Sequence, residues 1–391
     1  MSEFDDIIKK CEKEWGCPEL MESVNSTGGK KIPFSSPSLN WATYGGVPRA
    51  SLIEFYGVPG GGKTTTAIDV CKNALDIFNE EYSKEMIKLQ EAVAQGKKEA
   101  KITLQDLMDK GPKRVLYIDL EHSFDRKWAA TLGITNKAIK VMQPPNITAE
   151  SLLQKIIDLI SSGEVGLIVL DSIPSLVTKS ELEHKLDDEK QAFASALAGL
   201  MTKFCRLITQ LLARYDCTMI FINQMRTNME NAYVDSTPGG DAIKFYCSLR
   251  LKFLLGSPLD FLGNELPSKV ENPAGYKINV TIKKQKSAPF DRKLGTYYLM
   301  AQSGLRTDFE FVNLAITKYE IIRKAGGWFT LCDPVTKEPL EKNDSIVKIN
   351  GLAKVYDYMQ TDIEYYESLC QYILNDITHN GMDVEEIEVE E

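Results

Sequence analysis

The sequence predicts an α/β fold in which helices cover a mostly parallel, doubly wound sheet. The prediction rests first on three continuous apolar runs, Arg114–Asp119, Val165–Leu170 and Thr218–Asn223. Runs of this kind, without alternating polar residues, are typical of parallel strands buried on both faces. Between the second and third runs, apolar residues recur at helical spacing over Glu189–Arg214, which predicts an amphipathic helix. Strands that alternate with helices in this way indicate the doubly wound arrangement.

The composition is that of an ordinary globular protein. A chain of 391 residues allows one large core and a smaller appended unit. The first residues do not place a basic region before an apolar run, so a secretory signal is not expected. The longest apolar runs are too short to span a bilayer, and we expect a soluble, cytoplasmic protein. Eight cysteines without a CxxC pair and only three histidines argue against a zinc site or a disulfide framework.

The net charge is concentrated at the C-terminal end of the chain. The formal charge is −9, and Asp383–Glu391 contains six acids and no base. Removing these six charges leaves a nearly neutral body with a formal charge of −3. A basic face for nucleic acid is compatible with such a body, so charge neither supports nor excludes that class of partner.

A glycine-rich segment follows the predicted strand Ser51–Tyr56 and opens a predicted helix, Lys63–Phe78. Gly57–Thr64 fits the pattern G-x-x-x-x-G-K-[ST], in which backbone N–H groups and a helix N-terminus surround phosphate. Lys63 would then reach the β- and γ-phosphates, and Thr64 would ligate Mg²⁺. The cofactors predicted are therefore ATP and Mg²⁺. The residues predicted to bind nucleotide are Gly57, Pro59, Gly60, Gly61, Gly62, Lys63, Thr64 and Thr65.

Three polar residues fall where predicted strands end. Asp171 closes Val165–Leu170 and is placed to hold Mg²⁺ through water, although a plain strand-end or helix-capping acid has the same pattern. Glu121 follows another apolar strand and is a candidate general base, or else a solvated acid. Gln224 ends a third strand and begins the polar stretch 225–240, a segment that is either a mobile binding loop or an ordinary surface loop.

The remaining segments suggest smaller units around this core. Lys283–Lys286 ends an alternating strand and either meets phosphate or is simply solvated. Asn79–Lys113 is rich in Lys and Glu and is predicted to be an exposed helical insertion. A short helix over Asp5–Trp15 precedes a polar linker, and another helix is expected over Asp362–Asp376. The predicted units are residues 1–32 (N-terminal helix and linker), 33–306 (core), 307–380 (small C-terminal domain) and 381–391 (acidic disordered tail).

Taken in order, these motifs resemble bacterial RecA and its phage counterparts, including the UvsX type. The resemblance covers most of the chain and implies a RecA-like phosphate-loop ATPase core with an N-terminal polymerisation segment and a small C-terminal α+β domain. The segments that carry it are Gly45–Arg49, Ile118–His122, Leu170–Ser172, Phe221–Arg226, Gly239–Tyr246 and Lys284–Phe290.

The resemblance also implies roles for the catalytic candidates. Glu121 looks like the catalytic glutamate and Asp171 like the second acid of the magnesium site. Gln224 looks like the amide that couples the γ-phosphate to the DNA-binding loop that follows. Lys284 and Lys286 fall on the family's lysine pair, which reaches the ATP of the neighbouring subunit.

Further residues match the positions at which the family holds adenine and DNA. Asp125 and Trp128 fall on the adenine positions. Glu181–Asp188 matches the first DNA-binding loop, and Asn25–Ile32 resembles the segment that docks on the adjacent protomer. The DNA-binding residues implied around the second loop are Arg226, Asn228, Tyr233, Gly239 and Gly240.

The chain departs from the bacterial pattern in three places. The insertion Asn79–Lys113 has no counterpart, the second loop is shorter, and the second adenine-side aromatic is missing around Ala301–Ser303. The resemblance still implies an ATP-dependent strand-exchange recombinase that forms filaments on single-stranded DNA. Its expected partners are single- and double-stranded DNA, further copies of the chain, and single-strand-binding and loading proteins. A ring-forming RecA-fold helicase, and a DNA-binding mediator with a relic ATP site, are the alternatives.

Overall fold

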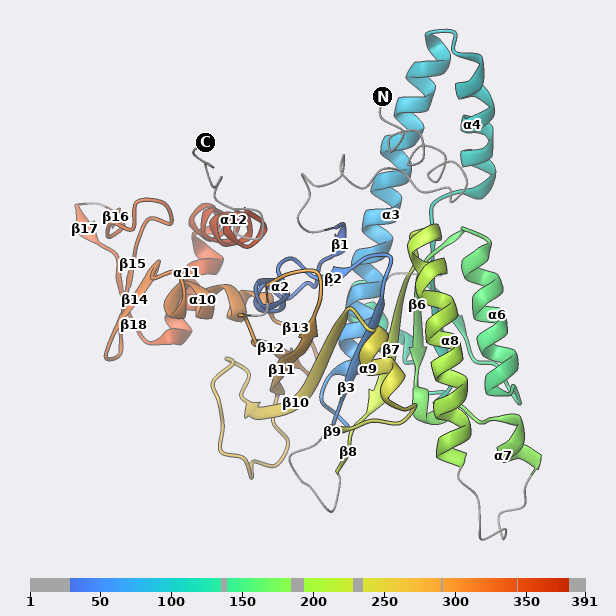
Figure 1. Ribbon diagram of the computed structural model, residues 1–391. Coiled ribbons are helices and arrows are strands. Elements are labelled where there is room, and N and C mark those ends of the chain that lie inside the picture. Colours follow the sequence, from blue (N-terminus) through green and yellow to red (C-terminus); the bar gives the residue numbers. More distant parts are fainter. Residues whose placement is uncertain are drawn as a thin grey trace, which may run out of the picture.

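A nine-stranded mixed sheet forms the centre of the computed structural model, which describes residues 29–134, 139–183, 193–227, 235–289, 291–342 and 344–379 (Figure 1). Its order is β13-β12-β11-β10-β3-β7-β6-β4-β5, and the six strands from β10 to β5 are parallel. The strands are β3 (Leu52–Gly57), β4 (Arg114–Asp119), β5 (Ile139–Met142), β6 (Val165–Asp171), β7 (Thr218–Gln224), β10 (Leu249–Leu259), β11 (Gly275–Gln285), β12 (Leu294–Met300) and β13 (Gly304–Leu305).

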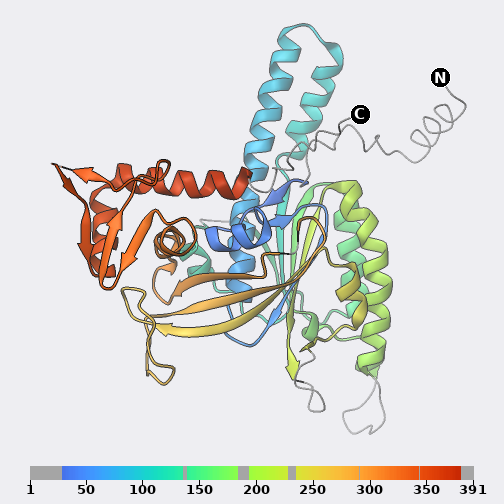
Figure 2. The ribbon, with the colours of Figure 1, turned by 60° about the vertical axis from the view of Figure 1, so that its left-hand side comes forward.

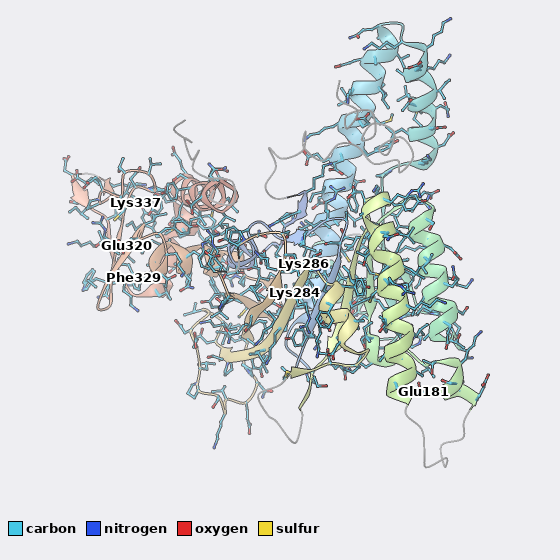
Figure 3. The ribbon with its side chains drawn as sticks, viewed as in Figure 1. Glu181, Lys284, Lys286, Glu320, Phe329 and Lys337 are labelled. Carbon is cyan, nitrogen blue, oxygen red and sulfur yellow. The ribbon has the colours of Figure 1, made fainter. Side chains whose placement is uncertain are left out.

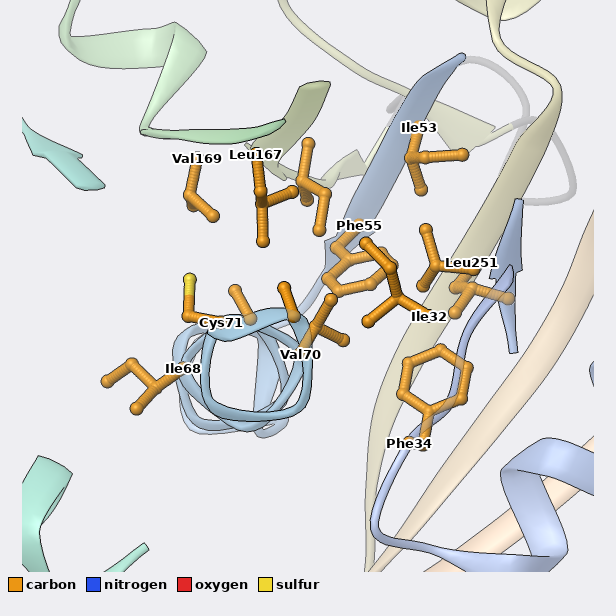
Figure 4. Close-up of a cluster of buried hydrophobic side chains, with 14 of the residues drawn as sticks. Ile32, Phe34, Ile53, Phe55, Ile68, Val70, Cys71, Leu167, Val169 and Leu251 are labelled. Carbon is orange, nitrogen blue, oxygen red and sulfur yellow. The ribbon is translucent and has the colours of Figure 1, made fainter. Parts of the chain in front are cut away.

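Helices cover both faces of the sheet, as the sequence predicts. One face packs on α3 (Lys63–Ala94), where Val70 and Cys71 contact a cluster that includes Val169 of β6 (Figure 4). The other face packs on α6 (Ala149–Ser161) and α8 (Phe193–Tyr215). Alternate residues of each strand therefore enter different cores, and both cores are apolar because the strands are apolar throughout. The α/β fold class is confirmed.

The predicted amphipathic helix is α8. Of the predicted span Glu189–Arg214, the residues that the structure describes lie in this helix, which ends at Tyr215 and buries a stripe that includes Met201, Phe204 and Ile208. Among the described helices, α8 is long and apolar enough by composition to cross a membrane. Its buried stripe lies in the core beneath the sheet, as expected of a core helix.

The insertion is a helical hairpin, and the first helix is longer than predicted. The sequence indicates a helix that ends at Phe78, but α3 continues without a break to Ala94. A turn at Gly96 then leads into α4 (Lys98–Lys110), which packs back along α3. The hairpin projects beyond the sheet (Figure 1), at the edge opposite the carboxyl ends of the parallel strands. Lys- and Glu-rich sequence favours helix, and nothing at Phe78 stops it.

A small α+β unit follows the sheet and has its own apolar core. It contains α10 (Thr307–Thr317), α11 (Leu352–Thr361), α12 (Ile363–His379) and the sheet β14-β15-β18, with strands Ile322–Ala325, Trp328–Leu331 and Lys348–Asn350. Figure 2 shows this unit beside the strands β10–β12. The predicted helix Asp362–Asp376 corresponds to α12. The predicted helix Asp5–Trp15 and the acidic tail lie outside the described residues.

A buried glutamate joins this unit to α2 (Pro37–Thr43) of the core. Glu310 of α10 is 1% exposed, and one carboxyl oxygen accepts hydrogen bonds from the Ser36 hydroxyl and the Ser38 N–H. The other oxygen, Oε1, is buried and has no hydrogen-bond partner among the residues that the structure describes. Burial therefore raises the pKa of Glu310 well above its usual value, although the two serine contacts oppose the shift.

Replacing Glu310 by Gln should remove a pH-dependent loss of stability. Because the folded-state pKa is raised, the native protein holds a proton that the unfolded chain releases above pH ~4.3. Wild-type stability should therefore fall by about 1.4 kcal/mol per pH unit from this group as pH rises toward the folded pKa. Glu310→Gln should lack this component in urea unfolding between pH 5 and 8. Equal pH slopes in the two proteins would contradict the assignment.

Candidate nucleotide-binding site

Four parallel strands bring the predicted site residues to one edge of the sheet. Gly57 at the end of β3 pairs with Gln224 at the end of β7, and Asp119 at the end of β4 pairs with Asp171 at the end of β6. In an open α/β sheet this carboxyl edge is where ligands bind. The site predicted from separate segments is therefore a single place in the fold.

The loop between β3 and α3 has a backbone that only glycine can adopt readily. Gly57 and Gly62 have φ values of 151° and 86°, and a Cβ at these positions would collide with the Phe253 backbone and the Tyr297 hydroxyl, respectively. Pro59, Gly60 and Gly61 form the turn between them. No side chain caps the N-terminus of α3, so its first N–H groups are left for an anion.

Lys63 and Thr64 stand at the first turn of α3. The Lys63 Nζ donates to the carbonyls of Gly57 (3.3 Å) and Val58 (2.7 Å) in the loop. Burial lowers the pKa of Lys63, while Asp171 and Glu121 act in the opposite direction. An ammonium held only by carbonyl oxygens can exchange them for phosphate oxygens, which carry more negative charge.

Asp171 is the buried acid of the site. Its Oδ2 accepts hydrogen bonds from Thr64 Oγ1 (2.9 Å) and from the Tyr117 hydroxyl (2.6 Å). Burial raises the pKa of Asp171 to about 6, although these two hydrogen bonds oppose the shift. A hydroxyl can donate one hydrogen bond and still offer a lone pair, so Thr64 can contact both Asp171 and a cation.

Glu121 is held at the mouth of the site by its neighbours. Asp119 fixes the turn after β4, because its carboxylate accepts the N–H groups of Glu121 (3.1 Å) and Phe124 (2.9 Å). Glu121 Oε1 accepts a short hydrogen bond from the Ser172 hydroxyl and a longer one from Gln224 Nε2 (3.4 Å). The predicted base and the predicted amide sensor are therefore in direct contact.

The two residues predicted to hold adenine lie beside α3. Asp125 caps α5 (Arg126–Thr131), with Oδ1 accepting from the N–H groups of Lys127 and Trp128. Trp128 donates its indole N–H to Thr65 Oγ1 at 3.2 Å. Trp128 and Thr65 are thus brought together next to the phosphate loop. The roles of Asp125 and Trp128 toward adenine stay predictions.

The two predicted DNA-binding loops begin at the same edge. The polar stretch after β7 is not wholly irregular, because β8 (Arg226–Thr227) pairs with β9 (Asp235–Ser236). Asn228 and Tyr233 lie outside the described residues, as does the Arg226 side chain. The first loop leaves α7 (Lys179–Glu183), and its remainder also lies outside them.

The end of the second loop is tied to the sheet through buried polar groups. Asn223 donates to the carbonyl of Pro238 (3.0 Å) and to Glu54 (2.9 Å), which also pairs with Arg250 (2.5 Å). Gly239 and Gly240 follow with positive φ and lead into α9 (Asp241–Tyr246). A Cβ at Gly239 or Gly240 would press on the side chains of Ile243 and Ala198, respectively, so both glycines allow close packing.

Lys284 and Lys286 lie close to each other (Figure 3), set back from the phosphate loop of their own chain. In the strand register, Lys284 of β11 is opposite Arg250 of β10, and Arg250 is opposite Glu54 of β3. Glu54 lies three residues before Gly57, or about 10 Å along the strand. Both lysines donate to the Phe245 carbonyl at the end of α9, at 2.7 and 3.1 Å. Burial, together with the nearby Lys286 charge, lowers the pKa of Lys284.

Sequence reasoning missed three hydroxyl groups that position the site. Tyr117 contacts Asp171, Ser172 contacts Glu121, and Tyr297 contacts Thr66 Oγ1 (2.8 Å) and the Gly62 carbonyl (3.2 Å). Tyr117 stands inside an otherwise apolar strand, and a buried tyrosine hydroxyl needs a partner. The hydroxyl of Tyr117 in an apolar strand therefore indicated a buried hydrogen bond, but the sequence alone does not say which residue accepts it.

The arrangement fits a nucleoside triphosphate with a divalent cation. The N–H groups at the start of α3 and Lys63 suit the phosphates, while the Thr64 hydroxyl would ligate Mg²⁺ and Asp171 would hold it through water. Glu121 and Gln224 stand at the same edge, where a water could be oriented.

Comparison with known proteins shows similarity to one family along most of the chain. The family model of the RecA N-terminal domain matches residues 84–305, starting within α3 and downstream of the phosphate loop. RecA of Thermus thermophilus is 31% identical over 333 residues, which cover 84% of each chain. RecA of Mycoplasma mycoides subsp. mycoides SC is 32% identical over 335 residues, or 84% of this chain and 82% of the relative. RecA of Fusobacterium nucleatum subsp. nucleatum is 30% identical over 350 residues, or 88% and 80%.

Proposed function

The chain belongs to the RecA family, and on that premise we propose that it is an ATP-dependent strand-exchange recombinase acting as a filament on single-stranded DNA. Membership of this family implies the RecA-like α/β core and ATP binding. The observation that carries the rest is the contact between Glu121 and Gln224, at the point where the predicted second DNA loop leaves β7. Chemistry at the phosphate and movement of a DNA-contacting loop can then be linked through one amide.

Each residue has a distinct role in the proposed hydrolysis. Lys63 would leave its carbonyl partners for the β- and γ-phosphates, and Thr64 and Asp171 would hold Mg²⁺, which would neutralise phosphate charge. Glu121 orients the attacking water and accepts its proton. Gln224 donates to the γ-phosphate and loses that partner after hydrolysis, which releases the loop it precedes.

The position of the lysine pair supports an active site shared between two chains. Lys284 is level with Glu54 in the middle of β3, and Lys286 is hydrogen-bonded to Ser248 beside the amino end of β3, so both are set back from the edge that bears the phosphate loop. They can therefore meet the nucleotide of a neighbouring copy stacked head to tail. Contacts of this heterologous kind build open helical filaments when the rotation does not close.

The proposed partners follow from this assembly. Single-stranded DNA is held largely by its backbone along the filament, and an incoming duplex is tested by base pairing. Single-strand-binding and loading proteins are further expected partners, and the host cytoplasm is the expected location. DNA-dependence of ATP hydrolysis, combined with electron microscopy of the complex, tests the proposal as a whole. Rings rather than filaments would favour a helicase.

Lys63→Ala should abolish both ATP hydrolysis and strand exchange. The variant loses the only charge that the phosphate loop itself directs at the β- and γ-phosphates. Phosphate release and joint-molecule formation measure the two activities, with circular dichroism as the control for folding. Wild-type turnover in a folded Lys63→Ala protein would refute the assignment of the loop.

Glu121→Gln should separate nucleotide binding from chemistry. Gln can keep the contacts to Ser172 and Gln224 but cannot accept a proton, so the rate should fall by roughly 10²–10⁴. ATP-bound filaments should still form and should outlast those of the wild type. Normal hydrolysis by this variant would place the base elsewhere.

Replacing both Lys284 and Lys286 by Ala should leave ATP binding intact and nearly abolish hydrolysis. The closest analogy is the arginine finger, which is worth about 10³–10⁵ in rate in other phosphate-loop enzymes. Mixing this variant with Lys63→Ala should restore some turnover, because one junction then combines an intact loop with intact lysines.

Lys283→Ala is the matched control for that experiment. It removes a neighbouring positive charge of the same strand, at the irregularity between the Leu251–Ile282 and Arg250–Lys284 pairs, and leaves Lys284 and Lys286 in place. Its hydrolysis should equal that of the wild type. If the double variant keeps its DNA-independent turnover and mixing rescues nothing, the lysines serve only DNA or solvent.

A further inference from the structure

Two hydroxyl groups converge on the same oxygen of Asp171. The Tyr117 hydroxyl donates to Oδ2 at 2.6 Å, and Thr64 Oγ1 donates to it at 2.9 Å. Tyr117 and Asp171 are 0% and 2% exposed, so neither group can exchange this contact freely for bulk water. Among the described residues, no donor reaches the other carboxylate oxygen, Oδ1.

The strand register explains why this tyrosine reaches that acid. Tyr117 of β4 pairs with Val169 of β6, and Asp171 lies two residues further along β6 on the same, α3-facing side. Tyr117 and Asp171 are thus diagonal neighbours across the two strands. The ring also packs edge-on against Phe124, with centroids 5.0 Å apart. A phenylalanine would preserve this packing and would remove the hydroxyl contact with Asp171.

We infer that Tyr117 is a positioning residue of the magnesium site, fixing the Asp171 carboxylate so that Oδ2 faces Thr64 and Oδ1 is left for the hydrated cation. This inference rests on the proposed function, which assigns Mg²⁺ to Thr64 and Asp171. Hydrogen bonds from outer groups to metal-binding carboxylates orient them in this way, and their loss weakens metal binding. Tyr117 itself does not touch the metal or the phosphates.

Tyr117→Phe tests the inference without depending on turnover. A fluorescent, non-hydrolysable ATP analogue is bound at a series of Mg²⁺ concentrations, and bound Mn²⁺ is counted separately by electron paramagnetic resonance. The metal concentration needed for half-maximal binding should rise by roughly 10- to 100-fold. Nucleotide affinity in EDTA should stay at the wild-type value, because the phosphate loop is unchanged.

Two control variants separate the possible outcomes. Tyr365→Phe also removes a buried hydroxyl, but this hydroxyl donates to the Cys332 carbonyl of the C-terminal unit at 2.9 Å, so the metal requirement of the variant should match the wild type. Asp171→Asn should raise the requirement if the proposed magnesium site is right. A shift in Asp171→Asn without one in Tyr117→Phe would overturn the inference alone. An unchanged metal requirement in Asp171→Asn would refute the proposed magnesium site and the inference together. If Tyr117→Phe lost as much nucleotide affinity in EDTA as in Mg²⁺, Tyr117 would have only a packing role.

Discussion

The parallel register of β3, β7, β6 and β4 is the constraint on which both the core and the site depend. Sheet residues alternate between faces, so a slip of one residue in β6 would turn Asp171 away from α3 and Val169 out of its cluster. The same slip would therefore cost buried apolar area and separate the acid from Thr64. Packing and chemistry are not independent here, and the stability of the apolar strands holds the polar edge in place.

A buried ion pair extends this constraint to strands that never touch the nucleotide. Glu54 and Arg250 have side-chain exposures of 0% and 11%, and charges so far from water are tolerated only when paired and hydrogen-bonded. Arg250 also lies over the Tyr56 ring at 4.8 Å. Through Asn223 the pair reaches Pro238, so β3, β10 and β7 share one polar cluster with the end of the second loop. That cluster gives the loop a fixed anchor.

The strands could be predicted from the sequence, and so could the candidate site residues that the fold brings to one edge, because both predictions depend on local patterns. Apolar runs such as Val165–Leu170 are unambiguous when turns bound them, and a glycine-rich loop between strand and helix has few other uses. The end of α3 could not be predicted from the sequence, because the Lys- and Glu-rich stretch after Phe78 shows little apolar periodicity. The second half of α3 packs on α4, and this tertiary contact is not visible in a local pattern. The contacts of Tyr117 and Ser172 could not be predicted for another reason. They join residues of different strands and loops, which come together only in the folded register.

The continuous helix α3 makes the insertion a mechanical extension of the phosphate loop. At 1.5 Å per residue its 32 residues form a rod about 48 Å long, with Gly62 at one end and the open turn at Gly96 near the other. A tilt of about 5° at the loop would carry the far end by about 4 Å. A distance probe attached near Gly96 would therefore report a rigid tilt of α3 as a larger displacement than a probe at the phosphate loop.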